Sequence, residues 1–233
     1  MNSMTPISLT SNGAAGGASL AERNRVLRNT YWLLALSMVP TVLGAWIGVS
    51  TGIASAMSPG IGLVVFLAGA FAFMFAIEKT KHSAAGVPVL LAFTLFMGLM
   101  LSRLVGQVLG LANGANLVML AFAGTGAIFL GMATLSSVIR RDLSSMGKFL
   151  FIGAVMLLVA GIANVFIQSS ALMITLSVLA TGIFSAFILY DLKRVQDGSE
   201  TNYISATLSV YLSIYNVFQS LLALLGLTSG QDE

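Results

Sequence analysis

Seven apolar runs constrain this chain more than any other feature, because each approaches the roughly 20 residues that a helix needs to cross a bilayer. The runs are Thr30–Val49, Ile61–Ile77, Gly86–Leu101, Leu117–Val138, Phe149–Ile167, Leu172–Tyr190 and Tyr203–Leu227. The third run extends to Val108 if its helix tolerates Arg103. Short connections make consecutive helices antiparallel neighbours. The pattern predicts an all-α polytopic membrane protein with seven transmembrane helices.

Composition supports this class of protein and favours the lipid bilayer over nucleic acid as its partner. Apolar residues make up 57% of the 233 residues and charged residues only 8%, against about 25% charged in a typical soluble domain. So few charges could not cover a soluble surface, and the expected partner is the lipid bilayer. The net charge of +3 is better explained by basic cytoplasmic loops than by binding of nucleic acid. The absence of cysteine excludes disulfides and thiolate metal sites.

The basic residues predict how the chain is oriented. Ten of the eleven lie before the first run or after the second, fourth and sixth runs, which places them on one side of the membrane. They are Arg23, Arg25, Arg28, Lys79, Lys81, Arg140, Arg141, Lys148, Lys193 and Arg194. Since basic loops stay in the cytoplasm, we expect a cytoplasmic N-terminus and an outer C-terminus.

The chain divides into three parts on this reading. Residues 1–28 are predicted to be a disordered cytoplasmic tail followed by a basic lead-in, with no cleaved signal peptide. Residues 29–228 form the membrane domain, and residues 229–233 form a short outer tail. The turn signal Ser58-Pro59-Gly60 precedes the second span.

The seventh run carries a polar stripe that a lipid-facing helix would not need. Ser205, Ser209, Ser213, Asn216 and Ser220 recur every three or four residues and so share one helical face. This helix should be surrounded by the others or line a wet cavity. The stripe is then either hydrogen-bonding glue between helices or part of a functional cavity.

Small residues elsewhere predict close helix packing. Ala123, Ala127 and Gly131 recur every fourth residue, as do Gly106 and Gly110.

No catalytic pattern stands out in the sequence. Asn164 and Gln168 are interpreted as a helix-capping pair, and His82 as a solvated loop residue. There is no nucleophile elbow, HExxH helix or phosphate-binding loop. We therefore expect a protein that is not an enzyme.

The stretch "FILYDLK" places Asp191 where the sixth run ends. Two interpretations are open: a helix-end acid in solvent beside Lys193 and Arg194, or a buried carboxylate that serves as a proton or cation site. The candidate site residues are Asp191, Ser213, Asn216 and Tyr190, with Lys79, Lys81 and Arg194 as charge partners.

Several stretches resemble a known family along nearly the whole membrane portion. These are "VLRNTYWLLALS", "AFTLFMGLML", "RRDLSSMGKFLF", "GIANVF" and the long "ILYDLKRVQDGSETNYISATLSVYLSIYNVFQSLLALLG". They resemble the Bax inhibitor-1 family, and its bacterial YccA-type branch, whose members modulate the FtsH membrane protease. The resemblance implies a fold in which six helices surround a central seventh.

The resemblance also bears on Asp191. In calcium-leak members an aspartate at this position pairs with an aspartate of the seventh span, and the pair responds to pH. Here the second position is Ser213, which cannot supply a second charge. One carboxylate with serine and asparagine makes a weak site for Ca²⁺, the only metal cofactor considered, because Ca²⁺ takes six to eight oxygens. Arg103 stands where close relatives often have proline.

Two functions follow from this resemblance. The leading expectation is a regulatory protein of the bacterial inner membrane that binds an FtsH-type protease complex. The N-terminal tail is then either a handle for the protease or an ordinary disordered terminus. The alternative is a pH-sensitive leak channel for calcium or another cation, centred on Asp191. The replacement of the second aspartate by Ser213 favours the first.

Overall fold

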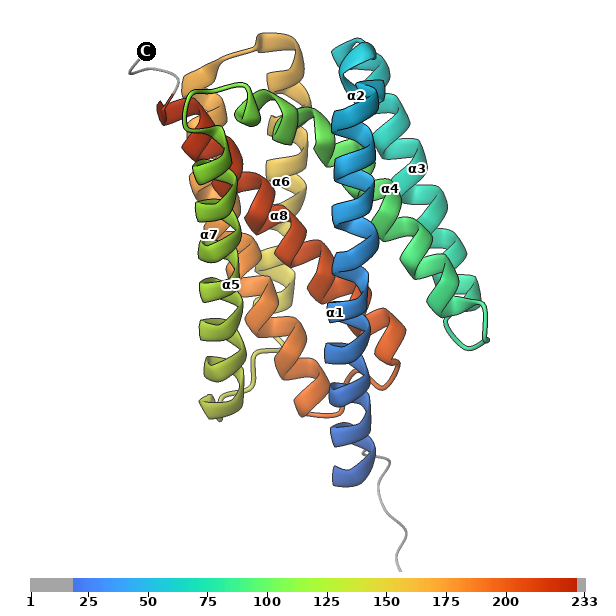
Figure 1. Ribbon diagram of the computed structural model, residues 1–233. Helices are drawn as coiled ribbons and strands as arrows, with labels where there is room; N and C mark the ends of the chain where they lie inside the picture. Colours follow the sequence, from blue (N-terminus) through green and yellow to red (C-terminus); the bar gives the residue numbers. More distant parts are fainter. Residues whose placement is uncertain (1–18, 230–233) are drawn as a thin grey trace, which may run out of the picture.

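The computed structural model describes residues 19–229, which form a bundle of helices (Figure 1). The helices are α1 (Leu20–Thr51), α2 (Ile53–Ala56), α3 (Pro59–Thr80), α4 (Gly86–Leu109), α5 (Gly114–Val138), α6 (Met146–Ile167), α7 (Ser170–Gln196) and α8 (Tyr203–Ser229). All except α2 are long and apolar enough to cross a membrane. The predicted all-α fold with seven spans is confirmed. Of the two predicted tails, residues 1–18 and 230–233 lie outside the described residues.

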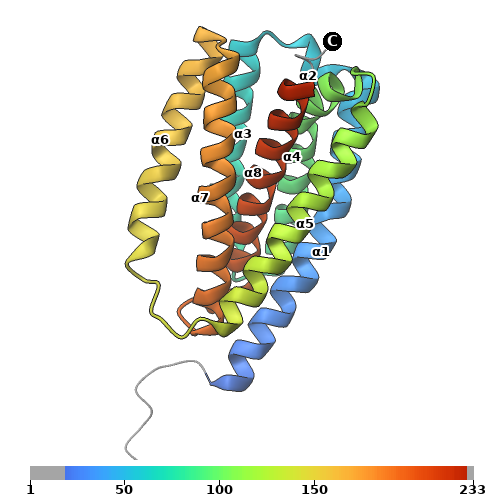
Figure 2. The same ribbon diagram turned by 90° about the vertical axis from the view of Figure 1, so that its left-hand side faces the viewer.

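Helix α1 starts well before its predicted span and takes in the basic lead-in. Its first turn is capped by Ser19, whose Oγ accepts a hydrogen bond of 3.2 Å from the backbone N–H of Glu22. With 32 residues the helix is about 48 Å long, whereas the hydrocarbon core of a bilayer is about 30 Å thick. Figures 1 and 2 show its N-terminal turns projecting past the neighbouring helices.

Helix α4 runs without interruption through Arg103, so the longer alternative for the third run is correct. Arg103 Nη1 donates a hydrogen bond of 3.2 Å to the carbonyl of Met57, in the connection between α2 and α3. Helix α3 begins as the turn signal indicated, with Ser58 as the cap and Pro59 in the first turn. The arginine thus tethers α4 to the start of α3.

Helix α8 lies in the middle of the bundle, as the polar stripe and the family resemblance predicted. It packs against α7 most extensively, then against α5, α1 and α4, and it touches α3. Between Ile204 and Leu227 none of its residues is exposed. Helix α6 packs on the outer side of α7, and Figure 1 shows α8 crossing obliquely behind α5 and α1.

The tightest helix pair is α1 with α4, and glycine makes it possible. A Cβ on Gly44 would collide with the backbone of α4 at Leu95, and one on Gly98 would collide with the Thr41 carbonyl of α1. The close approach therefore requires glycine on both helices.

The packing predicted for the other small residues is wrong. Ala123, Ala127 and Gly131 are exposed on the outer face of α5, and a Cβ on Gly131 would meet nothing. A Cβ on Gly106 would meet only the edge of Val49. Spacing showed that these residues share a face, but not that the face points outward.

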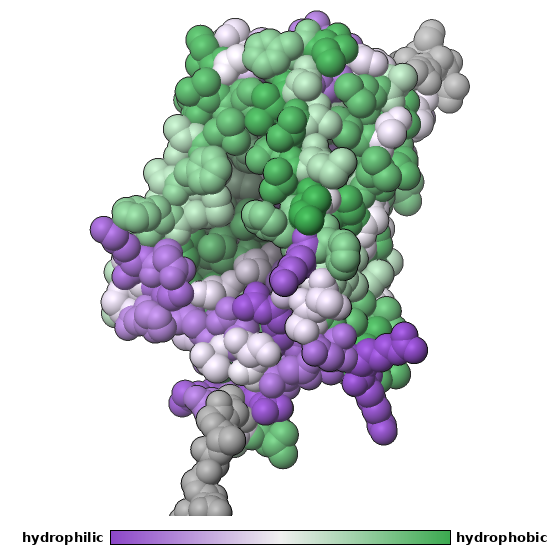
Figure 3. Space-filling view, turned by 180° about the vertical axis from the view of Figure 1, so that it is seen from behind, coloured by the Kyte–Doolittle hydropathy of each residue, from purple (hydrophilic) through white to green (hydrophobic). Residues whose placement is uncertain are grey.

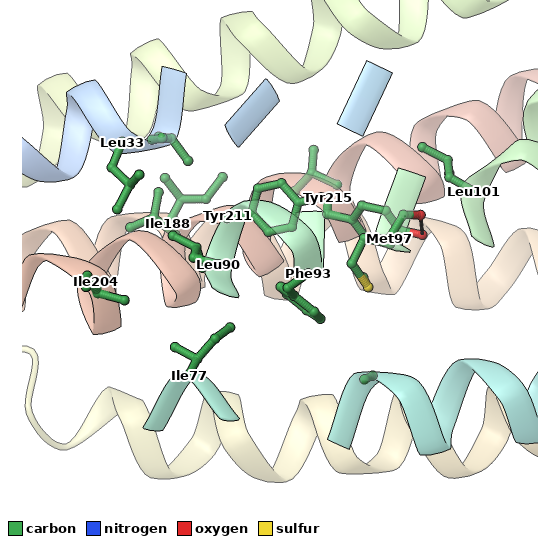
Figure 4. Close-up of a cluster of buried hydrophobic side chains, with 14 of the residues drawn as sticks. Leu33, Ile77, Leu90, Phe93, Met97, Leu101, Ile188, Ile204, Tyr211 and Tyr215 are labelled. Atoms are coloured by element: carbon green, nitrogen blue, oxygen red, sulfur yellow. Dashed lines mark hydrogen bonds between the residues drawn. The ribbon is translucent and has the colours of Figure 1, made fainter. Parts of the chain in front are cut away.

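The core combines aliphatic and aromatic side chains from five helices. Figure 4 shows Tyr211 and Tyr215 of α8 among Leu33 of α1, Ile77 of α3 and Phe93 of α4, with Ile188 of α7 nearby. The aromatic rings pack tilted or edge-on, with Phe93 and Tyr211 at 6.2 Å between centroids. These contacts hold the central helix in a fixed rotation.

The surface separates into an apolar band and a hydrophilic rim. Figure 3 shows hydrophobic residues over most of the height, with a hollow in this face, and hydrophilic residues gathered at one end. We call this the basic end: it holds the start of α1 and the α3–α4, α5–α6 and α7–α8 connections (Figure 1). Such an arrangement suits a protein embedded in a bilayer.

Candidate functional site

Asp191 lies inside α7 near the basic end, and it is buried. The helix continues past it to Gln196, and only 7% of the residue is exposed. It shares the inward face of α7 with Ile188, Leu192 and Val195, which are fully buried. The interpretation of Asp191 as a helix-end acid in solvent is therefore wrong.

Three groups act most directly on the Asp191 carboxylate. Arg194, one turn further along α7, acts on it as an opposite charge, and Ser213 of α8 faces it with a hydroxyl. The Ser213 hydroxyl also donates a hydrogen bond of 3.1 Å to the Ser209 carbonyl of its own helix. Glu200, in the α7–α8 connection, adds a second negative charge to the same region. The structure thus brings Asp191, Ser213 and Arg194 together.

The other expected site residues have different neighbours. Lys81 forms an ion pair of 2.6 Å with Glu78, and the ammonium of Lys79 lies 4.6 Å from the centre of the Phe75 ring. Asn216 donates to the Leu212 carbonyl of its own helix, at 2.8 Å. None of the three has Asp191 as a partner among these contacts.

Tyr190 borders the site through Arg194, whose guanidinium lies 5.7 Å from the centre of the Tyr190 ring. The same ring packs against Gly147 at the start of α6, where the Cβ of any larger residue would collide with the Tyr190 ring unless the ring moved. Tyr190 therefore positions the arginine rather than the carboxylate.

A polar chain extends from Arg194 across the basic end, and no sequence pattern indicated it. Arg194 pairs with Glu200 at 3.6 Å, and Glu200 accepts from the backbone N–H of Asn202 at 2.9 Å. The Asn202 amide then donates to the Lys81 carbonyl at 2.9 Å and lies 3.4 Å from Nδ1 of His82. The α3–α4 and α7–α8 connections are joined in this way. Lys81 and His82 are about 120 residues away from Asn202 in sequence, so only the fold could place them together.

The polar stripe on α8 contributes less between helices than expected. Ser213 and Asn216 bond carbonyls of their own helix. The hydrogen bonds to other helices include those from Tyr211 to Thr41 of α1, at 2.9 Å, and from Tyr215 to the Met97 carbonyl of α4, at 3.2 Å. A longer one, of 3.4 Å, runs from the Thr207 hydroxyl to the Thr30 carbonyl of α1. The residues that join α8 to its neighbours are therefore mainly its tyrosines.

The capping role of Asn164 is confirmed: its Oδ1 accepts from the backbone N–H of Ser169, at 3.1 Å, where Gln168 ends α6 in a left-handed conformation.

The site offers little to a divalent metal ion. Within residues 19–229 no group of three or more histidine, cysteine or acidic side chains is close enough to share one. Asp191 could contribute at most two oxygens, and Ca²⁺ takes six to eight. The arrangement suits a single buried charge held by an arginine and a hydroxyl.

Residues 23–230 match the family model described as Inhibitor of apoptosis-promoting Bax1. The chain belongs to the Bax inhibitor-1 family. This confirms the resemblance drawn from the sequence, and it covers all seven apolar helices.

Bacterial relatives are similar along nearly their whole length. A protein of Escherichia coli (strain K12) named Modulator of FtsH protease YccA is 36% identical over 211 residues, or 91% of this chain and 94% of the relative. An uncharacterised membrane protein of Vibrio cholerae is also 36% identical, over 91% of this chain and 93% of its own. An uncharacterised protein of Neisseria meningitidis is 38% identical over 92% and 96%. This member of the Bax inhibitor-1 family is thus a multi-pass membrane protein.

Proposed function

We propose that this chain is a modulator of an FtsH-type AAA protease in the bacterial inner membrane and tempers the degradation of membrane proteins. The observation that carries the proposal is the likeness to the E. coli modulator, which extends over 91% of this chain and 94% of that one. The chain would act by binding rather than by catalysis. The basic end would face the cytoplasm, in keeping with its excess of arginine and lysine.

The shape of the bundle supports a binding role. A central helix surrounded by others gives a rigid body, and its outer surface offers long apolar helices to a partner in the membrane. Helix α1 projects at the basic end (Figure 2), and residues 1–18 precede it in the sequence. The protease would reach the chain through this segment, whose own structure lies outside the described residues.

The test is co-purification followed by a turnover assay. The full chain, tagged at its C-terminus, is extracted in mild detergent and probed for the protease, with an unrelated seven-span protein as the control. We expect the protease to co-purify with this chain and not with the control. We also expect a longer half-life of a membrane-protein substrate in cells that produce this chain. Repeated absence of the protease, together with an unchanged half-life, would refute the proposal.

A second candidate function is a cation leak, which the burial of Asp191 opposite Ser213 favours. A carboxylate inside a membrane helix is costly and often marks an ion or proton path. The test is Ca²⁺ and proton flux in proteoliposomes at mildly acidic and mildly alkaline pH. If Asp191 carries the flux, Asp191→Asn changes it.

Two further variants distinguish the loss of the paired carboxylate site from the absence of a cation path through the bundle. Ser213→Asp restores a second carboxylate facing Asp191, whereas Ser209→Asp adds the same charge one turn away. A leak that opens only with Ser213→Asp means that the fold keeps the path and this chain lacks the paired site. The absence of Ca²⁺ and proton flux in the natural protein and in all variants would refute the leak function.

A further inference from the structure

One face of α1 turns away from the bundle and changes in character along its length. Arg25 and Arg28 are exposed near the start of the helix. Trp32 follows one turn after Arg28 and is 73% exposed, and Leu36 and Val39 beyond it are 48% and 55% exposed. Steps of three and four residues keep all five on one face. Two cations, an amphipathic ring and an apolar track therefore follow one another toward the centre of the membrane.

The surface is hollowed on both sides of the Trp32 ring. The first hollow is lined by Asn24, Leu27, Arg28, Tyr31, Trp32 and Ala35. The second is lined by Asn29, Trp32, Leu33, Ala35, Leu36 and Tyr203. Tyr31 is held in place by an edge-to-face contact with Phe129 of α5, at 6.2 Å between ring centres. Each hollow thus combines polar groups toward the basic end with apolar groups toward the membrane centre.

Arg25 and Arg28 differ from other cations of the basic end in their lack of an acidic partner within residues 19–229. Lys81, Lys193 and Arg194 each pair with an acid at the basic end. Arg25 and Arg28 form no ion pair with any residue of the described chain. A guanidinium group matches a phosphate with two parallel hydrogen bonds, so a phosphate is the chemical partner that fits them.

The length of the track matches one leaflet. From Trp32 to Leu43, which is on the same face and exposed, the helix rises about 16 Å. Half of the hydrocarbon core is about 15 Å thick. With the Trp32 ring at the polar–apolar boundary, where indole rings concentrate, an acyl chain would extend along the exposed apolar residues to the middle of the bilayer.

We propose that this face of α1 binds an anionic phospholipid from the leaflet at the basic end. Arg25 and Arg28 hold the headgroup phosphate, the Trp32 ring packs at the level of the glycerol, and an acyl chain lies along Leu36 and Val39. The bound lipid holds the projecting turns of α1 at the membrane surface. The inference is independent of the protease proposal.

The two tryptophans of the chain allow a test at the site itself. Trp46→Phe leaves Trp32 as the reporter, and Trp32→Phe leaves Trp46, further along the same face. The full chain is reconstituted in phosphatidylcholine vesicles with increasing fractions of phosphatidylglycerol or phosphatidylcholine that carry bromine on the acyl chains, which quenches nearby indole fluorescence. We expect half-quenching of Trp32 to need a lower fraction of brominated phosphatidylglycerol than of brominated phosphatidylcholine, by a factor of about five or more. A factor of about five corresponds to the attraction of one basic residue to an anionic membrane surface. Trp46 should show no such preference.

Charge variants in the Trp46→Phe background decide whether this is a site or a diffuse attraction. Arg25→Gln with Arg28→Gln should abolish the preference, and Arg25→Lys with Arg28→Lys should keep most of it, which shows that the protein still folds. The matched control is Arg140→Gln with Arg141→Gln, which removes two exposed cations from the same end. Equal quenching by both lipids, or an equal loss in the control, would overturn the proposal.

Discussion

The phenol of Tyr211 in α8 lies 2.9 Å from the hydroxyl of Thr41 in α1. The Thr41 hydroxyl lies 2.8 Å from the Ser37 carbonyl and donates to it, so the phenol is the donor toward Thr41. One turn later Tyr215 donates to the Met97 carbonyl of α4 (Figure 4). The central helix is thus tied to the α1–α4 pair at two successive turns.

The two parts of this tie, hydrogen bond and ring, can be separated by substitution at Tyr211. Tyr211→Phe removes only the bond, and buried hydrogen bonds between membrane helices average about 0.6 kcal/mol. Tyr211→Ala also removes the ring from a fully buried position and should cost about 3–5 kcal/mol. The measurement is thermal or denaturant unfolding in detergent, with Tyr215→Phe as a second hydrogen-bond deletion. Equal destabilisation by phenylalanine and alanine would contradict this division.

A single methyl group at the α1–α4 contact should be poorly tolerated. Gly98→Ala places a Cβ against the Thr41 carbonyl, so the backbones must separate, at about 1–3 kcal/mol. Gly131→Ala is the matched control, because its Cβ meets nothing and alanine favours the helix by up to about 1 kcal/mol. The free energy of unfolding of the two variants should move in opposite directions. A neutral Gly98→Ala would show that the helices can part without cost.

The spans and the central position of α8 could be predicted because both depend on which residues can face lipid. A helix in lipid shows its length as an apolar run, and a polar stripe such as Ser205 to Ser220 cannot face lipid. The packing faces could not be predicted in the same way, since apolar and small residues suit both lipid and a neighbouring helix. Ala123 and Gly131 therefore looked like packing residues and are exposed, while Gly44 and Gly98 make the close contact.

The site was predictable only in part, for a related reason. Asp191, Ser213 and Arg194 lie on two adjacent helices, and the family resemblance pointed to the first two. Burial of Asp191 could not be inferred from "FILYDLK", because Lys193 and Arg194 resemble a helix entering water. The helix instead continues to Gln196 while Lys193 pairs with Asp197 at 2.9 Å. The contact from Asn202 to Lys81 depends on two connections meeting, which no local pattern encodes.

Arg103 should matter for the connection between α2 and α3 more than for the bundle. Arg103→Met keeps the aliphatic stem but removes the donor to the Met57 carbonyl, a charged hydrogen bond of about 1.5–3 kcal/mol. We expect faster cleavage of this connection by an added protease in reconstituted vesicles. Arg141→Met, which removes an exposed arginine at the opposite end, should leave cleavage unchanged. The same rate in both variants would mean that the tether has no effect on the connection.

Asn202 has two roles that two substitutions can separate. Its Oδ1 caps α8 by accepting from the backbone N–H groups of Ile204 and Ser205, at 2.9 and 3.1 Å, while its Nδ2 donates to the Lys81 carbonyl. Asn202→Asp keeps the acceptor, which the positive end of a helix favours, and loses the donor. Asn202→Ala loses both, and a lost cap alone costs about 1 kcal/mol.

Amide hydrogen exchange can report the two losses independently. Exchange in the α3–α4 connection should rise in both Asn202 variants, because both lose the bond to Lys81. Exchange at Ser205 should rise only in Asn202→Ala, because the aspartate still accepts its N–H. Faster exchange at Ser205 in Asn202→Asp would show that the cap depends on the contact with the α3–α4 connection. The two roles would then be one coupled unit at the basic end, and Glu200 and Arg194 would couple it in turn to Asp191.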